Sequence, residues 1–474
     1  MENIINAKNL VNGKLVTTKN KALVYEVNTN NIIGQVPVMS TKDVDVAMSS
    51  AKEAFLMWSS LSLKERISYL LKAADILEKN AQSISEILIK EVAKPRNDSL
   101  NEVIRTAELI RYTCEIALSN SDEILYGSSY EKNNVDICIA KRVPIGVVLC
   151  IVPYNYPINL AGSKIAPALV SGNTVVIKPA TPSCLSTLAL VNAFAKAGIP
   201  AGVLNSVTGK GSVIGDYLTS HEAVNFINFT GSSPVGKHMT TVAGMKALLF
   251  ELGGKDAALV LNDADLEKTA EQIVKGAFSY SGQRCTAIKR VLVQSEIKEQ
   301  LTALIVEKVN KLTIGNASDN CAITPLVDKW SAKNFTALYE DAKQKGATMH
   351  QPLKVEGSLC YPVVASNVSL DANLAWEEPF APILPIITCN TIEEMIKINN
   401  KSEYGLQASI FTKNVKLANE IALKLEVGSI HINYRTQRGP DNFPFLGVKD
   451  SGIGVQGIRF SIESMTRLKA IISH

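Results

Sequence analysis

The chain has 474 residues, of which 46% are hydrophobic and 20% charged, and its formal net charge at pH 7 is +4. This length exceeds what one compact core usually holds, so two or three domains are expected, and the composition is ordinary for a soluble globular protein. The small net charge and the lack of a dense Lys/Arg block argue against a nucleic-acid partner.

The N-terminal segment has no basic stretch followed by an apolar one, which argues against a signal peptide. The longest uncharged stretch, residues 143–163, is interrupted by prolines and asparagines, so a buried strand and a loop are expected there rather than a membrane span. The eight cysteines include no CxxC pair, and a chain of this size does not depend on disulfides. We therefore expect a cytoplasmic protein with reduced thiols, no metal site and no membrane partner.

Residues 41–118 are expected to be helical. Apolar residues recur at helical spacing, and Ser62, Ser83 and Ser99 are each followed three positions later by Glu, which is the pattern of a capping box. Residues 119–142 change to a polar segment followed by DICIAKRV, whose alternation is typical of an edge strand. This hairpin either meets another subunit or lies on the surface of the monomer, and the sequence leaves both interpretations open.

From residue 146 to residue 262, short apolar runs such as GVVLCIV and NTVVIK alternate with helical segments. Runs without a polar face indicate strands that are covered on both sides, and hence a mostly parallel α/β sheet. Residues 263–450 show the same features and form a second α/β region, followed by a short tail with alternating apolar character. Such sheets bind ligands where the carboxyl ends of their strands meet loops.

Two glycine-rich loops could hold a pyrophosphate. Residues 209–215, GKGSVIG, and residues 231–236, GSSPVG, each follow a predicted strand and open a predicted helix. Either loop could direct backbone N–H groups and a helix N-terminus at a phosphate, although the first is one residue longer than the dinucleotide pattern GxGxxG. Glycines that only allow a tight turn are the alternative.

Lys178 ends the predicted strand NTVVIK and is followed closely by Thr181. If a nucleotide binds there, this stretch offers a cation and a hydroxyl group but no carboxylate. A ribose 2′-phosphate would meet no opposing negative charge, so NADP is favoured over NAD. A solvated strand end is the alternative.

Glu251 and Cys285 are the candidate reactive groups. Glu251 lies in the apolar segment KALLFELGGK, where desolvation favours a neutral carboxyl group that can act as a general base, unless the side chain pairs with Lys255. Cys285 follows Arg284 in YSGQRCTA, and a neighbouring cation would stabilise a nucleophilic thiolate, unless the cysteine is one more buried thiol. No histidine lies beside a cysteine or in a glycine-rich elbow, so a carboxylate base is favoured over a His-based hydrolase site.

A set of motifs then occurs together and in order: PYNYP (153–157), KPAT (178–181), FELGGK (250–255), YSGQRCTA (280–287), WEEPFAP (376–382) and FPFLGVKDSGIG (443–454). The set resembles the aldehyde dehydrogenase superfamily over nearly the whole chain. The resemblance implies an α/β fold with a Rossmann-like cofactor domain, an α/β catalytic domain and a β-strand oligomerisation arm in a homotetramer. The implied ranges are 1–122 and 143–253 for the NADP-binding domain, 254–450 for the catalytic domain, and 123–142 and 451–474 for the arm.

The resemblance also implies the chemistry. Cys285 would attack an aldehyde carbon, Asn155 and the Cys285 backbone N–H would stabilise the oxyanion, and Glu251 would activate the water that hydrolyses the resulting thioester. The implied cofactor is NADP, and the positions that match the family's cofactor-binding residues are Lys178, Thr181, Gly211, Asp216, Gly231, Ser232, Leu252, Glu378 and Phe380.

More narrowly, the sequence resembles the non-phosphorylating, NADP-dependent glyceraldehyde-3-phosphate dehydrogenases, which implies oxidation of D-glyceraldehyde 3-phosphate to 3-phosphoglycerate. The positions implied to bind the phosphorylated aldehyde are Arg105, Tyr156, Arg284, Thr286 and Arg438. Arginine suits this task because its guanidinium group binds phosphate through several hydrogen bonds.

Two positions depart from the family pattern: Ala381 replaces a usual Gly, and Tyr154 replaces a usual Trp or Phe. Three alternatives remain open: another small aldehyde or semialdehyde as substrate, a cysteine esterase, and a non-catalytic protein that retains the fold.

Overall fold

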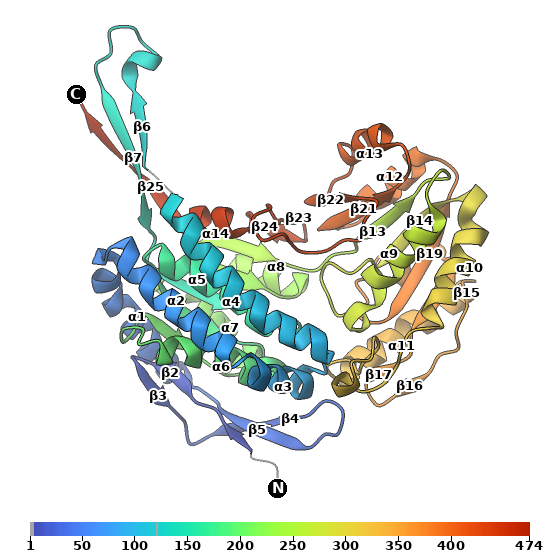
Figure 1. Cartoon of the computed structure of the whole chain (residues 1–474), viewed down its shortest axis with the longest axis horizontal. Coiled ribbons are helices and arrows are strands. Elements are labelled where there is room, and N and C mark those ends of the chain that lie inside the picture. Colours follow the sequence, from blue (N-terminus) through green and yellow to red (C-terminus); the bar gives the residue numbers. More distant parts are fainter. Residues whose placement is uncertain (1–3, 120–121) are drawn as a thin grey trace.

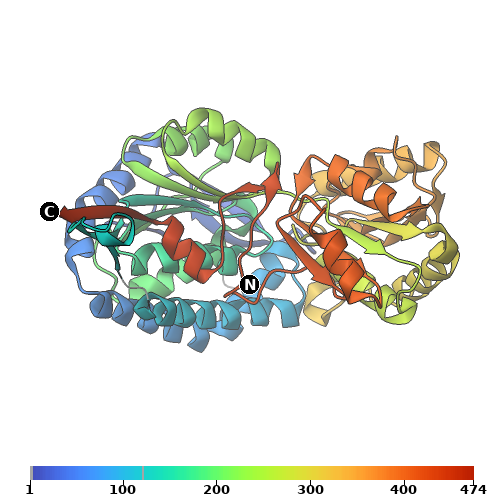
Figure 2. The same cartoon turned by 90° about the horizontal axis from the view of Figure 1, so that it is seen from above.

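The structure is a computed structural model that describes residues 4–119 and 122–474. Two α/β lobes lie side by side, and a narrow arm of strands projects from one of them (Figures 1 and 2). The α/β class expected from the sequence is confirmed. In the described residues, no helix combines the length and the apolar character that crossing a membrane requires.

The first lobe contains a six-stranded sheet in the order β10-β9-β8-β11-β12-β24. The first five strands are parallel, and β24 is antiparallel to β12. These strands are β8 (Val147–Ile151), β9 (Thr174–Lys178), β10 (Leu204–Ser206), β11 (Val224–Thr230), β12 (Ala247–Glu251) and β24 (Gly452–Ile453).

Helices cover both faces of this sheet, which explains why its strands are apolar without interruption. Along β8, Val148 and Cys150 face one core, while Val147 and Leu149 face the core on the opposite side. The first face is covered mainly by α2 (Leu63–Lys79), α3 (Ala81–Val92), α4 (Arg96–Ser119), α5 (Pro157–Val170), α6 (Cys184–Lys196) and α14 (Ile458–Ser464). The second face is covered by α1 (Thr41–Ser60), α7 (Gly211–Ser220) and α8 (Ser233–Val242).

The helix starts agree only in part with the predicted capping boxes. The box at Ser62 is present, because Ser62 accepts from the Glu65 backbone N–H and the Glu65 carboxylate accepts from the Ser62 N–H. The boxes at Ser83 and Ser99 are wrong, because α3 begins at Ala81 and α4 at Arg96, so both serines lie inside helices. Their hydroxyl groups donate instead to backbone carbonyl groups of earlier residues.

The second lobe contains a seven-stranded sheet in the order β15-β18-β19-β14-β13-β21-β22, which is parallel except for β15. Its strands are β13 (Ala257–Val260), β14 (Arg290–Gln294), β15 (Thr348–Met349), β18 (Val363–Ser366), β19 (Ile383–Cys389), β21 (Gln407–Phe411) and β22 (Ser429–Ile432). Its helices are α9 (Leu266–Phe278), α10 (Lys298–Val309), α11 (Lys329–Gln344), α12 (Ile392–Lys401) and α13 (Val415–Ala422). Residues of β13 alternate between two cores, so this sheet is also covered on both faces.

The arm is an antiparallel sheet of three strands, β6 (Glu123–Tyr126), β7 (Ile137–Pro144) and β25 (Thr466–Ser473), with β7 in the middle. It extends away from the first lobe (Figure 1). The remaining short strands form pairs or a small three-stranded sheet: β1 (Ile5–Asn6), β2 (Asn9–Val11), β3 (Lys14–Val16), β4 (Lys21–Tyr25), β5 (Ile32–Pro37), β16 (Val355–Glu356), β17 (Leu359–Cys360), β20 (Tyr404–Gly405) and β23 (Val448–Lys449).

Candidate active site

The candidate site lies at the carboxyl ends of the first sheet, where the second lobe meets it. β12 ends at Glu251, β9 ends at Lys178, and the loop after β8 carries Asn155. Cys285 comes from the second lobe, in the loop after the 3₁₀ helix η3 (Ser279–Gly282). The strand ends of a parallel sheet share one edge, so the fold brings these distant residues together.

An unusual backbone holds the loop that leads to Cys285. Tyr280 and Ser281 have positive φ angles of 51° and 54°, a conformation that non-glycine residues seldom adopt. The Ser281 hydroxyl group donates to the Thr324 carbonyl oxygen at 2.7 Å and accepts from the Thr324 N–H at 2.8 Å, which fixes this turn. Gly282 also has a positive φ, and a Cβ there would lie 2.6 Å from the carbonyl oxygen of Ala381. The loop therefore requires glycine at this position.

The Cys285 thiol is half-buried, and its pKa is raised to about 11, chiefly by desolvation. The positive charge of Lys289 opposes this rise, while the carboxyl groups of Glu251, Glu378 and Asp256 add to it. The sequence indicated Arg284 as the stabilising cation. In the structure the Arg284 guanidinium donates to the Gly276 carbonyl oxygen at 2.5 Å, and Lys289 is the cation that lowers the pKa of the thiol.

Asn155 is buried and held at both ends of its amide group. Its Nδ2 donates to the Gln283 carbonyl oxygen at 3.0 Å, and its Oδ1 accepts from the Tyr156 N–H at 3.1 Å. This arrangement turns the NH₂ group toward the Cys285 loop and leaves one N–H for another acceptor. Asn155 therefore has a free N–H beside the loop that carries Cys285.

Glu251 is 3% exposed, and only one of its two carboxyl oxygens has a hydrogen-bond partner among the described residues. Its Oε2 accepts from Arg438 Nη1 at 3.2 Å, whereas its Oε1 is buried and has no partner in the described part of the chain. Burial raises the pKa of Glu251, and the charges of Arg438 and Lys164 oppose this shift. The alternative that Glu251 pairs with Lys255 is wrong, because the Lys255 ammonium group donates to the Glu377 carbonyl oxygen at 2.6 Å.

A chain of polar side chains extends behind Glu251. Arg438 Nη2 donates to Gln456 Oε1 at 2.7 Å, and the buried Lys164 ammonium group donates to Asn228 Oδ1 at 2.6 Å. Desolvation lowers the pKa of Lys164 to about 8, although the charge of Glu251 opposes this shift. Sequence reasoning missed Lys164, whose only indication was a lysine inside the apolar segment of α5.

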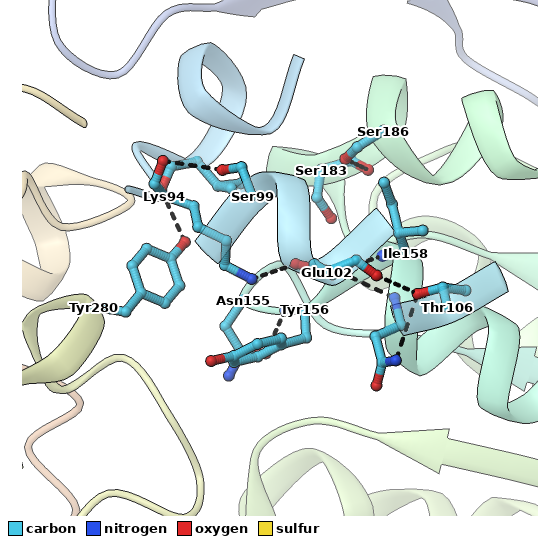
Figure 3. A network of polar contacts seen from close by, with 12 residues as sticks. Lys94, Ser99, Glu102, Thr106, Asn155, Tyr156, Ile158, Ser183, Ser186 and Tyr280 are labelled. Carbon is cyan, nitrogen blue, oxygen red and sulfur yellow. Dashed lines mark hydrogen bonds and ion pairs between the residues drawn. The ribbon is translucent and has the colours of Figure 1, made fainter. Parts of the chain in front are cut away.

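A second buried network, shown in Figure 3, joins the loops on either side of the site. Lys94 is fully buried, forms an ion pair with Glu102, and places its ammonium nitrogen 3.5 Å from the centre of the Tyr156 ring. The same nitrogen lies 5.0 Å from the centre of the Tyr280 ring. The Lys94 ammonium group therefore contacts both the loop that carries Asn155 and the turn that precedes Cys285.

Glu102 completes this network from α4 (Figure 3). Its Oε1 accepts from the first backbone N–H groups of α5, those of Ile158 at 2.9 Å and Asn159 at 3.1 Å. Its Oε2 accepts from Lys94. Sequence reasoning missed both residues of the pair, because Glu102 was assigned to a capping box and nothing in the sequence linked it to Lys94 or to α5.

Two of the predicted cofactor residues, Lys178 and Thr181, lie at the same edge of the first sheet. Lys178 is 6% exposed, and its ammonium group donates only to the Pro179 carbonyl oxygen among the described residues. Desolvation lowers the pKa of Lys178. Thr181 begins the next 3₁₀ turn. A buried ammonium group without a carboxylate beside it fits a phosphate ligand.

Two helices begin at the edge of the first sheet where Lys178 ends β9: α7 follows β10, and α8 follows β11. Ser232 precedes α8 and Gly211 begins α7, and neither helix has a side-chain cap, so their first N–H groups are available to an anion. The N–H of Gly231 is already bonded to the Glu251 carbonyl oxygen, and Asp216 pairs with His238 at 2.9 Å.

The remaining cofactor candidates surround Cys285 and Glu251. Glu378 Oε1 accepts from the Gly254 N–H at 3.1 Å and lies 3.2 Å from the Lys289 ammonium group. Leu252 is buried, and the Phe380 ring packs edge-on against Tyr154, with ring centres 6.1 Å apart. Together with the uncapped helices and Lys178, these groups fit an extended dinucleotide with an additional phosphate.

Of the five predicted substrate residues, Arg105 and Arg438 line one open pocket of about 470 Å³. Arg105 lies 3.2 Å from Asp441, a neighbour in that pocket. Burial raises the pKa of Tyr156, and the charge of Arg284 opposes this shift, so these two groups lie near each other. Thr286 is buried, and its carbonyl oxygen accepts from the Thr436 hydroxyl group.

Comparison with known proteins gives a consistent result. The sequence profile of the Aldehyde dehydrogenase family matches residues 16–471. The NADP-dependent glyceraldehyde-3-phosphate dehydrogenase of Streptococcus equinus is 53% identical over 466 residues, which are 98% of each chain. The 3-sulfolactaldehyde dehydrogenase of Priestia aryabhattai is 35% identical, over 98% of this chain and 97% of that one.

Among solved structures, the NADP complex of the NADP-dependent glyceraldehyde-3-phosphate dehydrogenase from Bacillus halodurans C-125 superimposes with a TM-score of 0.98. Its sequence is 47% identical, and the match covers 99% of both chains.

Proposed function

The chain belongs to the aldehyde dehydrogenase family, and from this premise we propose that it oxidises D-glyceraldehyde 3-phosphate to 3-phosphoglycerate with NADP as the hydride acceptor. The observation that carries the proposal is the 53% identity with the Streptococcus equinus enzyme over 98% of both chains. The site supports it with a thiol, a buried carboxyl group and arginine residues, which suit a phosphorylated aldehyde.

In the first step, the Cys285 sulfur bonds to the aldehyde carbon, and the carbonyl electron pair moves to the oxygen. The free N–H of the Asn155 amide and the backbone N–H of Cys285 donate to this oxyanion. A donor of this kind typically stabilises the transition state by about 3 to 4 kcal/mol. Only the thiolate attacks, so the thiol proton passes to solvent water before the carbon–sulfur bond forms, and the raised pKa of the thiol makes this loss less favourable.

Lys178 and the N-termini of α7 and α8 would hold NADP, which would supply the acceptor for the hydride that leaves the carbon bonded to Cys285. The acyl group is then held on the Cys285 sulfur as a thioester. The unpartnered Oε1 of Glu251 accepts a proton from the water that attacks this thioester, the carbon–sulfur bond breaks, and the sulfur leaves as a thiolate. The sum is aldehyde, water and NADP⁺ giving acid, NADPH and a proton.

The proposed phosphate site combines Arg105, Arg284, Arg438 and Tyr156. Two of these arginine residues already face the same pocket, and the third lies near Tyr156. Arginine also binds carboxylate and sulfonate groups, and one relative is named for a sulfonated aldehyde, so the nature of the anionic group needs a direct test.

The test is a substrate panel with purified protein. NADPH formation is followed with D-glyceraldehyde 3-phosphate, 3-sulfolactaldehyde and unphosphorylated glyceraldehyde, each with NADP and with NAD, and without inorganic phosphate. We expect the highest kcat/KM for the phosphorylated aldehyde with NADP. A higher kcat/KM for either other aldehyde overturns the substrate, and ester hydrolysis without nucleotide as the only activity overturns the redox reaction.

The arm supports a further part of the proposal, assembly into a homotetramer. All three of its strands expose large apolar side chains, which a monomer would leave in water: Ile124, Leu125, Tyr126, Ile137, Ile139, Leu468, Ile471 and Ile472. Light scattering coupled to gel filtration tests this, and a monomer at working concentration would contradict it. A cytoplasmic location, expected from the cysteine pattern, stays a prediction.

A further inference from the structure

Lys289 contacts the backbone of the nucleophile Cys285. Neither the sequence patterns nor the family resemblance indicated a role for this lysine. Its side chain is 2% exposed, and its backbone N–H donates to the Asp256 carbonyl oxygen at 2.9 Å, which fixes where the side chain starts. The ammonium group donates to the carbonyl oxygen of Cys285 and lies 3.2 Å from Glu378 Oε1. The same group thus contacts the backbone of the nucleophile and one of the carboxylates that surround it.

More carboxyl groups than cations act on the Cys285 thiol. Three carboxyl groups face it from different segments: Glu251 from the end of β12, Asp256 from the connection to β13, and Glu378 from the loop before β19. The Tyr156 hydroxyl group is a fourth titratable neighbour. Arg284 is adjacent in sequence, but its guanidinium donates to the Gly276 carbonyl oxygen. Lys289 is the buried cation that counteracts the carboxyl groups at the thiol.

We propose that Lys289 is a positioning residue that holds the backbone of Cys285 and supplies the positive charge that favours the thiolate. The proposal deepens the proposed function, because it concerns the nucleophile of the same reaction. Its physical basis is the strength of charge interactions in a desolvated site, where a unit charge a few ångströms away acts with little screening. Without that charge, desolvation and three carboxyl groups all favour the neutral thiol.

Lys255 provides a matched control within the same cluster. It is also buried, at 3% exposed, and it also donates to a backbone carbonyl oxygen, that of Glu377. Burial places the pKa of Lys255 well below its usual value, and the charges of Arg290 and Lys289 add to this shift, whereas Lys289 is the lysine whose charge acts on the Cys285 thiol. Lys289 and Lys255 therefore differ in contact with the Cys285 backbone and in charge at the thiol, but not in burial.

The experiment measures the alkylation of Cys285 by iodoacetamide in the full-length protein without substrate or nucleotide. The rate is followed by mass spectrometry of the Cys285 peptide, from neutral pH to about pH 11, where the thiol titrates. Since one pKa unit changes the thiolate fraction tenfold, we expect Lys289→Met to slow alkylation at neutral pH by about tenfold or more and to shift the profile to higher pH. Lys289→Arg should retain most of the rate, and Lys255→Met should leave the profile unchanged.

Lys289→Gln separates the two parts of the role, because an amide can still donate to the Cys285 carbonyl oxygen but carries no charge. We expect it to shift the profile as Lys289→Met does, and it serves as the test if the Met variant does not fold. An unchanged profile in a folded Lys289→Gln variant, or an equal shift in Lys255→Met, would overturn the proposal. The readout needs neither aldehyde nor NADP, so failure of the proposed substrate would leave this result intact.

Discussion

Two buried clusters, one beside the reaction site and one around Cys285 itself, differ in how fully their polar atoms are paired. In the Lys94–Glu102 network, both carboxylate oxygens accept hydrogen bonds and the ammonium group is enclosed by Glu102 and two aromatic rings. In the cluster around Cys285, Glu251 Oε1 and Asp256 Oδ2 are buried without a partner in the described residues. Buried polar atoms are nearly always paired in proteins, so these two oxygens have capacity to accept from water or a reactant, whereas the Glu102 carboxylate has both oxygens paired.

We therefore expect the fully paired cluster to stabilise the fold and the partly paired cluster to carry out the reaction. A fully paired network holds segments together, so its loss should lower the free energy of unfolding. A partly paired cluster is itself unfavourable for folding. Removing one of its groups should therefore abolish activity while changing the free energy of unfolding only a little. Substitutions in and around the two clusters test this difference, from the largest expected effect to the smallest.

The largest effect is expected for Cys285→Ala. Because the sulfur forms the covalent intermediate, NADPH formation should fall by at least about 10⁴-fold, while the free energy of unfolding changes little. Cys389→Ala is the matched control, since Cys389 is a fully buried thiol away from the site, and it should reduce stability but not turnover. Retained turnover in Cys285→Ala would remove the covalent mechanism.

Glu251→Gln should lower steady-state kcat by about 10²- to 10⁴-fold, because the amide cannot accept the proton of the attacking water. The first turnover should persist as a burst of NADPH, since Glu251 is needed only for hydrolysis of the thioester. Rapid-mixing absorbance at the NADPH band measures both phases. Equal loss of burst and steady state would instead place Glu251 before hydride transfer.

Glu102→Gln tests the paired cluster. It leaves the Lys94 charge buried without its counter-ion, and breaking such a pair typically costs about 3 to 5 kcal/mol in the free energy of unfolding. Urea unfolding measures it, and the double variant Glu102→Gln/Lys94→Met, which removes both charges, should recover part of the loss. A stable Glu102→Gln variant with low activity would contradict the expectation that the Lys94–Glu102 pair stabilises the fold rather than taking part in the reaction.

The smallest effect is expected for Arg105→Met. Arg105 is partly exposed and shares the pocket with Arg438, so its loss should raise KM for glyceraldehyde 3-phosphate about tenfold and leave unphosphorylated glyceraldehyde unaffected. Arg111→Met, on the same helix and paired with Asp75 and Glu78 instead, should change neither KM. An equal rise in KM for both aldehydes would remove the role of Arg105 in phosphate binding.

The sequence predicted what local patterns determine. The uninterrupted apolar runs indicated both covered sheets, and the apolar surroundings of Glu251 indicated its burial. Local reading failed at Ser83 and Ser99, because a capping pattern also occurs inside helices that begin a few residues earlier.

The hydrogen-bond partners of the reactive groups could not be predicted from the sequence, because they come from distant segments of the chain. Arg438 reaches Glu251 across 187 positions of sequence, and the Gln283 carbonyl oxygen reaches Asn155 across 128. Lys289 is only four positions from Cys285, but its contact with Glu378 depends on how distant segments of the second lobe pack against each other. No periodicity or motif spacing carries that information.

The covalent intermediate is the central claim, and the Glu251→Gln variant allows its direct detection. The variant is mixed with glyceraldehyde 3-phosphate and NADP, quenched in acid within the burst, digested and analysed by mass spectrometry. We predict a 3-phosphoglyceroyl group on the peptide that contains Cys285, in amounts matching the NADPH of the burst. NADPH formed without this adduct, or an adduct on another cysteine, would contradict the account.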